Sequence, residues 1–437
     1  MQNDLPELLS KHAHDIVFVR TFPSVLDFTD KRLDCWIEFF CKDGETFSVA
    51  LSGDNLPLIM SLLKITVLSE GRKLMCWDFK QLCSFVLAKT GVPLSVSCSL
   101  IDLKLLESYN GVRAEPPQSF SEAMARLRRL VQEGGYKLGE KIYRNVLLPL
   151  TTTVIPRLET VGILDKARDS KVYANYEIDG QENGRLRCSD AFLLGYVPHA
   201  MKPDFRANLR PIAYDEIFLS FDFRGMEVYT LAHVSGDSKL KNLCMSPDIY
   251  SAIYEAVVGE QYVEGSRELA KKMFLPVIYG QGPSSLARSC QIDHGKAEQI
   301  VRRIRSEFAE ANEFVLSHER QLEGSGCVRD VFGKTRRNFP EGKSYLARNF
   351  AVQSPASAIC LEKLINLYFA INDKAHIAYT VHDGYVLYVD KGVWREVLAR
   401  AHGVLTSECD LWPGLKLKVS CKAGSNLNEL KPVRPEN

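Results

Sequence analysis

Two aspartates stand where a carboxylate is held rigidly and still meets solvent. Asp222 ends the apolar run 217–221, and Asp383 lies in the turn His382-Asp383-Gly384 between two apolar runs. Brought together, two such carboxylates could hold two divalent metal ions roughly 4 Å apart. Magnesium suits them, because it is bound through few carboxylates and through the phosphates of a substrate. The pair therefore indicates chemistry on a phosphate.

Each aspartate also has a purely structural interpretation. An Asp-Gly pair such as Asp383-Gly384 is common in a type I′ turn. Asp222 could cap the helix that follows it. Taken singly, neither residue decides between a turn or cap and a metal ligand.

A third element carries positive charge. Arg267, Lys271, Leu275 and Tyr279 are four residues apart, so on a helix they share one face. Two cations followed by an apolar and an aromatic residue could meet a nucleotide in the order triphosphate, base, template. The alternative is an amphipathic helix with two solvated cations. Pro276 is unusual here, because a proline inside a helix removes one hydrogen bond and kinks it.

The elements that must position these residues can be read from periodicity. We expect strands at 217–221, 375–381 and 385–389, a helix at 226–234 and one long amphipathic helix at 295–323. Residues 265–350 carry 15 lysines and arginines against 10 acidic residues, which favours nucleic-acid binding only in combination with the motifs.

Residues 13–112 read as a small α/β unit that ends near the proline-rich stretch 113–119. Residues 120–165 look helical, with breaks at Gly134-Gly135 and Pro149. Within the α/β unit we expect two helices, at 79–87 and 103–108, and four strands, at 15–22, 35–40, 46–51 and 73–77.

Composition sets the outer limits. The chain has 437 residues, of which 46% are hydrophobic and 25% charged, which excludes a disordered, collagen-like or coiled-coil protein. The 55 basic and 54 acidic residues nearly cancel, so the total charge does not indicate a partner. Twelve cysteines without a CxxC motif indicate reduced core thiols rather than a zinc site. We see neither a secretory signal nor an apolar run of the roughly 18 residues that span a bilayer.

Six segments resemble the family A DNA polymerases, the DNA polymerase I type, and they occur along the chain in the same order as in that family. Residues 221–237 resemble motif A, Arg267 to Gly280 resemble motif B, and Val381-His382-Asp383 resembles motif C. Gly184-Arg185-Leu186 resembles the segment that precedes motif A. Gly333 to Arg336 and Asn349 to Gln353 resemble stretches between motifs B and C.

The resemblance implies a role for each matching residue. Asp222, Asp383 and the backbone carbonyl of Phe223 would hold two Mg²⁺ ions, for which Mn²⁺ can substitute. The nucleotide-binding set would be Arg267, Lys271, Leu275, Tyr279, Tyr250 and Glu227, with Glu227 as the steric gate against a ribose 2′-hydroxyl. The DNA-binding set would be Arg185, Arg336, Asn349, Gln353 and His382.

Several positions depart from the family pattern. Leu275 replaces an aromatic residue, Pro276 a glycine, Tyr250 a histidine, and Gly384 the last acid of motif C. Only 19 residues separate Asp165 from Arg185, where the family has a long helical thumb. We therefore expect a missing or much reduced thumb.

The N-terminal unit occupies the place of the family's proofreading nuclease. Its first strand should carry Asp-x-Glu but reads Val19-Arg20-Thr21-Phe22, and only scattered acids such as Asp78 and Asp102 remain. A two-metal nuclease cannot work on one or two isolated carboxylates. We expect a degenerate, structural domain.

The resemblance implies an α+β fold: a right-hand polymerase palm with an antiparallel sheet, helical fingers and an N-terminal RNase H-like α/β domain. We divide the chain into a degenerate exonuclease-like domain (1–112), a linker with palm entry and reduced thumb (113–184), palm (185–246), fingers (247–339) and palm (340–437).

The implied function is template-directed DNA synthesis without proofreading, in phage or mobile-element replication. The implied partners are primer–template DNA, dNTPs and a protein that supplies processivity or a thumb, and no membrane. The expected location is the cytoplasm, or the host cytoplasm for a phage protein. The alternative is a catalytically weak or inactive DNA-binding subunit that retains the palm.

Overall fold

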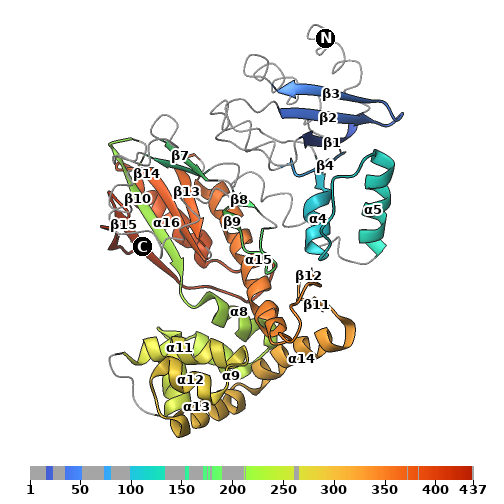
Figure 1. The fold of residues 1–437 in the computed structure, drawn as a ribbon. Helices are drawn as coiled ribbons and strands as arrows, with labels where there is room; N and C mark the ends of the chain where they lie inside the picture. Colours follow the sequence, from blue (N-terminus) through green and yellow to red (C-terminus); the bar gives the residue numbers. More distant parts are fainter. Residues whose placement is uncertain are drawn as a thin grey trace.

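Two five-stranded sheets and a group of helices make up the part of the chain that the computed structural model describes (Figure 1). The described residues are 16–22, 35–51, 73–79, 99–132, 153–156, 171–174, 176–177, 180–188, 211, 213–259, 265–371, 373–381 and 383–435.

The N-terminal sheet has the order β3-β2-β1-β4-β5. Strands β1 to β3 are antiparallel, whereas β4 and β5 run parallel to β1, which fits the expected RNase H-like α/β domain. The four expected strands are present, β5 was not predicted, and the expected helix at 79–87 lies almost wholly outside the described residues. The elements are β1 (Ile16–Phe22), β2 (Cys35–Cys41), β3 (Thr46–Leu51), β4 (Lys73–Trp77), β5 (Ser99–Asp102), α4 (Leu103–Tyr109) and α5 (Phe120–Gln132).

The second sheet is antiparallel and has the order β13-β14-β10-β15-β16, as expected for a palm. Its central strand, β10, is flanked by β14 on one side and β15 on the other. Helix α15 is buried along most of its length, including the polar or charged residues Ser354, Glu362 and Lys363. The elements are β10 (Glu216–Phe223), α15 (Leu346–Ile371), β13 (Ala375–Val381), β14 (Gly384–Asp390), α16 (Trp394–Thr406), β15 (Val419–Gly424) and β16 (Lys431–Pro432).

A group of helices lies beneath the palm sheet in Figure 1. Those within residues 249–325 fall in the segment expected to form the fingers (247–339), and the two that precede them, within residues 226–244, fall in the expected palm segment (185–246). Three of these helices begin at an aspartate whose side chain accepts a backbone N–H: Asp237, Asp248 and Asp293. The helices are α8 (Met226–Ser235), α9 (Ser238–Cys244), α10 (Ile249–Val258), α11 (Ser266–Ile278), α12 (Pro283–Cys290), α13 (His294–Glu307) and α14 (Ala309–Ser325).

The expectation of one long helix over 295–323 is wrong, because the segment forms α13 and α14. The break falls at Phe308, whose backbone leaves the helical region at φ −117° and ψ 55°. Its ring is fully buried and meets Phe274 edge-on, with ring centroids 5.2 Å apart. Packing of this ring between helices accounts for the break.

The expectation of helix over 120–165 is confirmed for α5 and wrong for 153–156, whereas 133–152 and 157–165 lie outside the described residues. Residues Thr153–Pro156 form β6, which pairs with β7 (Lys171–Ala174). Thr and Val are strand formers, so local propensity agrees with this pairing. Two further small pairs are β8 (Tyr176–Glu177) with β9 (Arg187–Cys188), and β11 (Val328–Arg329) with β12 (Thr335–Arg336).

The N-terminal unit contacts the polymerase-like part through the end of α4. The Nε of Arg337 donates to the Asn110 carbonyl at 3.4 Å, and the Lys334 ammonium lies 4.8 Å from the Tyr109 ring centre. These contacts connect α4 to the β11–β12 hairpin.

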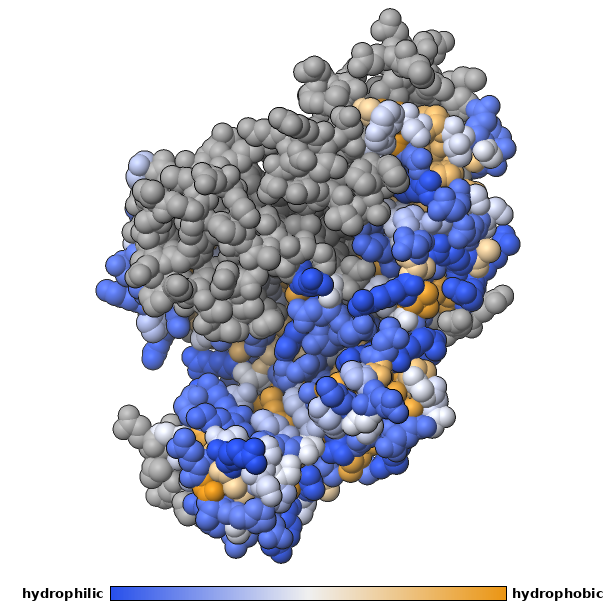
Figure 2. Space-filling view, viewed as in Figure 1, coloured by the Kyte–Doolittle hydropathy of each residue, from blue (hydrophilic) through white to orange (hydrophobic). Residues whose placement is uncertain are grey.

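Hydrophobic side chains of the helices are largely turned inward. On the face shown in Figure 2, the described surface is mostly hydrophilic, with separate small hydrophobic areas. No helix among the described residues has both the length and the apolar character needed to cross a membrane.

Candidate active site

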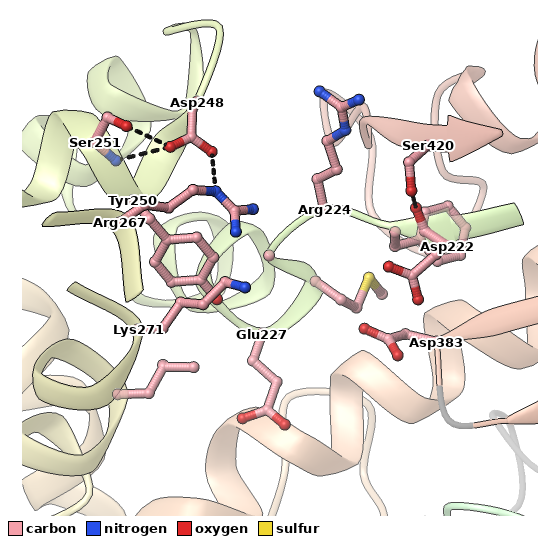
Figure 3. Close-up of a pocket in the computed structure, with 14 residues that line it drawn as sticks. Asp222, Arg224, Glu227, Asp248, Tyr250, Ser251, Arg267, Lys271, Asp383 and Ser420 are labelled. Atoms are coloured by element: carbon pink, nitrogen blue, oxygen red, sulfur yellow. Dashed lines mark hydrogen bonds and ion pairs between the residues drawn. The ribbon is translucent and has the colours of Figure 1, made fainter. Parts of the chain in front are cut away.

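Strand pairing brings Asp222 and Asp383 together. In the register of β10 and β14, Asp222 is opposite Gly384, the residue after Asp383. The backbone N–H of Phe223 also donates to the Asp383 carbonyl at 3.1 Å. Figure 3 shows the two carboxylates facing each other at one side of a cavity. The expectation that these distant aspartates meet is therefore confirmed by the structure.

Burial raises the cost of charging both carboxylates. Burial, and then the negative charge of Asp222, raise the pKa of Asp383 to about 6. Burial also raises the pKa of Asp222, against the opposing effect of Lys422 and Lys271. Such a pair of acids is a chemically suitable place for a divalent cation, which would favour the charged form of both.

A tight turn aims the next acidic side chain at the same cavity. Gly225, between β10 and α8, has a left-handed backbone with φ 71°. A Cβ at this position would lie only 3.1 Å from Ile249, so both the conformation and the space favour glycine. Helix α8 begins directly after this turn and carries Glu227 on its first turn.

Three side chains hold Glu227 in place. Its carboxylate accepts from Arg185 at 2.5 Å, from the Tyr279 hydroxyl at 2.5 Å, and from the amide of Gln353 at 3.5 Å. The Gln353 carbonyl in turn accepts from Asn183 at 3.1 Å. The structure thus connects four of the expected site residues in one hydrogen-bond network.

The cationic face of α11 is present as expected. Arg267 and Lys271 both lie against the ring of Tyr250, at 5.5 Å and 5.8 Å from its centre. Lys271 also contacts Glu268 at 3.2 Å. Burial, and then the charge of Glu227, raise the pKa of Tyr250 to about 12, so this phenol stays neutral.

Pro276 does not end helix α11. The helix continues to Ile278, and Tyr279 is its C-terminal cap, with its N–H bonded to the Leu275 carbonyl at 2.9 Å. Tyr279 therefore stands at the end of the helix rather than on its side. From there its hydroxyl still reaches Glu227.

The site is a cavity of about 900 Å³, which is large enough for a nucleotide. Asp222 and Asp383 lie at one side of it, and Arg267 and Lys271 lie at the other side together with Asp248 (Figure 3). Of the expected residues, those that line it are Asp222, Phe223, Glu227, Tyr250, Arg267, Lys271, Leu275 and Asp383.

The expected DNA-contacting residues form a less compact group. Arg185 and Gln353 reach the cavity indirectly through Glu227. Arg336 lies over the Phe339 ring at 4.3 Å, and both its Nε and the Oδ1 of Asn349 are buried without a hydrogen-bond partner. His382 lies outside the described residues. Within the described part of the chain, the Arg336 Nε can therefore donate to a polar group of a ligand, and the Asn349 Oδ1 can accept from one.

The sequence analysis gave no role to six residues that line the cavity, namely Arg224, Gly225, Met226, Asp248, Ser251 and Ser420. Ser420 donates to the backbone carbonyl of Asp222 at 3.2 Å, across the β10–β15 pair. Asp248 precedes a helical pattern and could have been recognised as a cap, but its contact with Arg267 follows only from the fold.

In the N-terminal unit the remaining acids have structural partners. Arg20 pairs with Glu38 and donates to the Pro117 carbonyl at 2.7 Å. Asp102 accepts from the backbone N–H groups of Asp78, Phe79 and Leu105 at 2.9–3.3 Å. Among the described residues, no group of three or more His, Cys, Asp or Glu side chains is arranged to hold a metal ion.

Comparison with known proteins gives a consistent set of similarities. The model of the family described as DNA polymerase family A matches residues 113–429. The chain is 26% identical over 280 residues to thermostable DNA polymerase I of Thermus filiformis, covering 60% of this chain and 33% of that protein. It is 24% identical over 284 residues to DNA polymerase I of Lactococcus lactis subsp. cremoris, covering 61% and 32%. The chain thus spans about a third of the length of these relatives.

A solved structure shares the fold. It is the POL domain of Pol1 from M. smegmatis in complex with DNA primer-template and dNTP. The two superpose with a TM-score of 0.78 at 15% identity, covering 97% of this chain and 98% of that one.

Proposed function

The chain belongs to the DNA polymerase family A, and from this premise we propose that it extends a primer along a template by adding deoxynucleotides. The observation that carries the proposal is the cavity itself. It has two facing carboxylates, Asp222 and Asp383, on one side and two cations, Arg267 and Lys271, on the other. Transfer of a nucleotidyl group depends mainly on positioning the reactants and on neutralising their charge.

Divalent metal ions are the cofactor that fits these residues. Asp222, Asp383 and the Phe223 carbonyl would hold two Mg²⁺ ions, with Mn²⁺ able to substitute. When bound, the ions lower the cost of the negative charge that develops on the attacking and leaving oxygens. The raised pKa values of both aspartates support this assignment, because burial disfavours the charged form of both carboxylates and a nearby cation would favour it.

The fingers would bind the triphosphate. Arg267 presents a planar guanidinium and Lys271 a compact ammonium, the two groups by which proteins usually bind phosphates. Both cations lie against the ring of Tyr250. Leu275 and Tyr279 would contact the base and the template, with Leu275 lining the cavity.

Glu227 would close the cavity below the sugar. Its carboxylate is fixed by Arg185 and Tyr279, so it cannot easily move away from an added 2′-hydroxyl. The proposed result is a preference for deoxynucleotides over ribonucleotides.

The primer and template would be bound by Arg185, Arg336, Asn349, Gln353 and His382. The unpartnered polar atoms of Arg336 and Asn349 support this for two of them. We propose the same five segments as above, with residues 1–112 as a structural domain without proofreading. The engagement of Arg20, Glu38 and Asp102 in internal contacts supports that assignment.

We also propose that this chain uses a partner for processivity, as in phage or mobile-element replication. The argument is the short distance of 19 residues between Asp165 and Arg185, part of which lies outside the described residues.

Primer extension tests the proposal. Four templates that differ only in the first unpaired base should each direct incorporation of the complementary dNTP in Mg²⁺, and a chelator should stop it. Binding of primer–template without incorporation in Mg²⁺ or Mn²⁺ would favour the alternative, an inactive DNA-binding subunit. The altered fingers, where Leu275 and Pro276 depart from the family pattern, and the expected loss of the thumb give that alternative its basis.

A further inference from the structure

Asp248 contacts the cationic face of the fingers from outside the family motifs considered above. Its Oδ1 accepts from the Nε of Arg267 at 3.0 Å. Its other oxygen accepts from the Ser251 backbone N–H at 3.0 Å and from the Ser251 hydroxyl at 2.5 Å. Asp248 is therefore fixed to the start of α10 while it binds a side chain of α11.

The hydrogen bond with Asp248 uses only the Nε of Arg267, so the two terminal nitrogens of the guanidinium can still bind a ligand. An arginine has five N–H donors, and Asp248 takes the one on Nε. Figure 3 shows the two terminal nitrogens of Arg267 pointing from this contact into the cavity, next to the Lys271 ammonium. The ring of Tyr250 packs against the guanidinium, with its centre 5.5 Å away, and restricts the movement of Arg267 from a second direction.

A second acid contacts Arg267 but is held less firmly. Glu268 meets a terminal nitrogen of Arg267 at 3.3 Å, and its side chain is 63% exposed. The Asp248 side chain is 30% exposed and has two further hydrogen bonds to Ser251. A polyphosphate that enters the cavity can displace Glu268 into solvent, whereas Asp248 can keep its contact on the other edge of the guanidinium.

We propose that Asp248 is a positioning residue that fixes the orientation of Arg267, so that its terminal nitrogens meet the triphosphate of the incoming nucleotide. The inference rests on the proposed polymerase function and assigns Asp248 a part in binding the substrate. Without Asp248, Arg267 keeps its charge but must lose more conformational freedom when it binds phosphate.

The test uses three variants of the full chain. Asp248→Asn removes the charge but keeps a good helix N-cap, since asparagine and aspartate are equally favoured there. Arg267→Lys keeps the positive charge and removes Nε. Asp293→Asn is the matched control, because Asp293 caps α13 in the same way and does not line the cavity.

Two measurements are made on each variant: single-nucleotide incorporation at varied dNTP, and equilibrium binding of tripolyphosphate with Mg²⁺. We expect Asp248→Asn to raise KM for dNTP about ten-fold or more, with a smaller change in kcat, and to weaken tripolyphosphate binding similarly. Affinity for primer–template and the melting temperature should stay as in the Asp293→Asn control.

The double variant separates positioning from a general effect of charge. If Asp248 acts through Arg267, the combined Asp248→Asn and Arg267→Lys variant should be no worse than Arg267→Lys alone. Additive effects would overturn the proposal. So would an unchanged or lower KM in Asp248→Asn, since a lower KM would make Asp248 a competitor of the triphosphate.

A failure of the proposed function is distinguishable from a failure of this inference. A wild-type chain that incorporates no nucleotide contradicts the polymerase assignment itself. An active wild type whose Asp248→Asn variant binds dNTP normally contradicts only the role of Asp248. If Asp248→Asn lowers the melting temperature, Arg267→Lys alone must still show the KM effect.

Discussion

Replacing Glu227 with alanine should make the enzyme accept ribonucleotides. The side chain is proposed to exclude the 2′-hydroxyl because it is held where that hydroxyl would lie. Its two short hydrogen bonds, to Arg185 and to the Tyr279 hydroxyl, both measure 2.5 Å. The variant removes the carboxylate and leaves space in the cavity that Glu227 lines.

The size of the effect follows from these contacts. A ribonucleotide could fit in the wild type only if Glu227 moved and gave up both bonds. Hydrogen bonds to a charged group contribute about 1.5–3 kcal/mol each, so the cost is about 3–6 kcal/mol. Since about 1.4 kcal/mol is a factor of ten, discrimination by this residue should be about 10²- to 10⁴-fold. We expect Glu227→Ala to lose at least the lower figure.

The assay is single-nucleotide incorporation of matched dNTP and rNTP, compared as kcat/KM. Tyr279→Phe removes one of the two bonds and keeps the aromatic ring, so discrimination should fall by about 10- to 10²-fold. Glu255→Ala is the control, because Glu255 is an exposed glutamate on α10 that does not line the cavity. It should leave discrimination unchanged.

An unchanged dNTP/rNTP ratio in Glu227→Ala, with normal dNTP incorporation, would refute this reasoning. It would mean that another group meets the 2′-position. A fall in Tyr279→Phe as large as in Glu227→Ala would show instead that the bond to Arg185 contributes nothing to holding the gate.

Asp102→Asn should remove a pH dependence of stability. Burial, and then the charge of Asp78, raise the pKa of Asp102 to about 7. The folded protein therefore keeps a proton that the unfolded chain releases near about pH 4. The wild type should then lose up to about 1.4 kcal/mol per pH unit relative to the variant between these values, and parallel melting curves from pH 5 to 7.5 would contradict this. A labelled DNA single strand incubated with Mg²⁺ should stay full length, because Arg20 lies on the β-strand that should carry nuclease ligands. Degradation that persists in Asp222→Ala and is lost in Asp102→Ala would contradict this expectation. Synthesis by the isolated chain should be distributive and should fall steeply with salt, because the proposed reduced thumb would offer few phosphate contacts; long products under trap DNA at physiological salt would contradict it.

The site could be predicted largely because its residues lie in ordered motifs. Asp222 ends one apolar strand, and Asp383 lies in the turn between two others. A palm requires these strands to pair. The contact of Asp248 with Arg267 could not be predicted in this way. It joins residues 19 positions apart on two helices, whose packing depends on side chains elsewhere in the core.

The errors in the fold have similar causes. Helical periodicity continues through Phe308, but burial of its ring against Phe274 breaks the helix there. Helical spacing was also followed through Thr153–Pro156, although the β-branched run before Pro156 favours a strand. In both places the partner that decides the local structure is distant in sequence: Phe274 in one case and Lys171–Ala174 in the other.

The most direct test of the central claim is primer extension by Asp222→Asn and Asp383→Asn in Mg²⁺, each compared with wild type. Both variants keep the size of the side chain and remove a charge from the facing pair. We predict that each binds primer–template as wild type does and loses nucleotide addition by at least about 10³-fold, the scale of a major electrostatic contribution. Extension at the wild-type rate by either variant would contradict the claim that these two carboxylates are the catalytic centre.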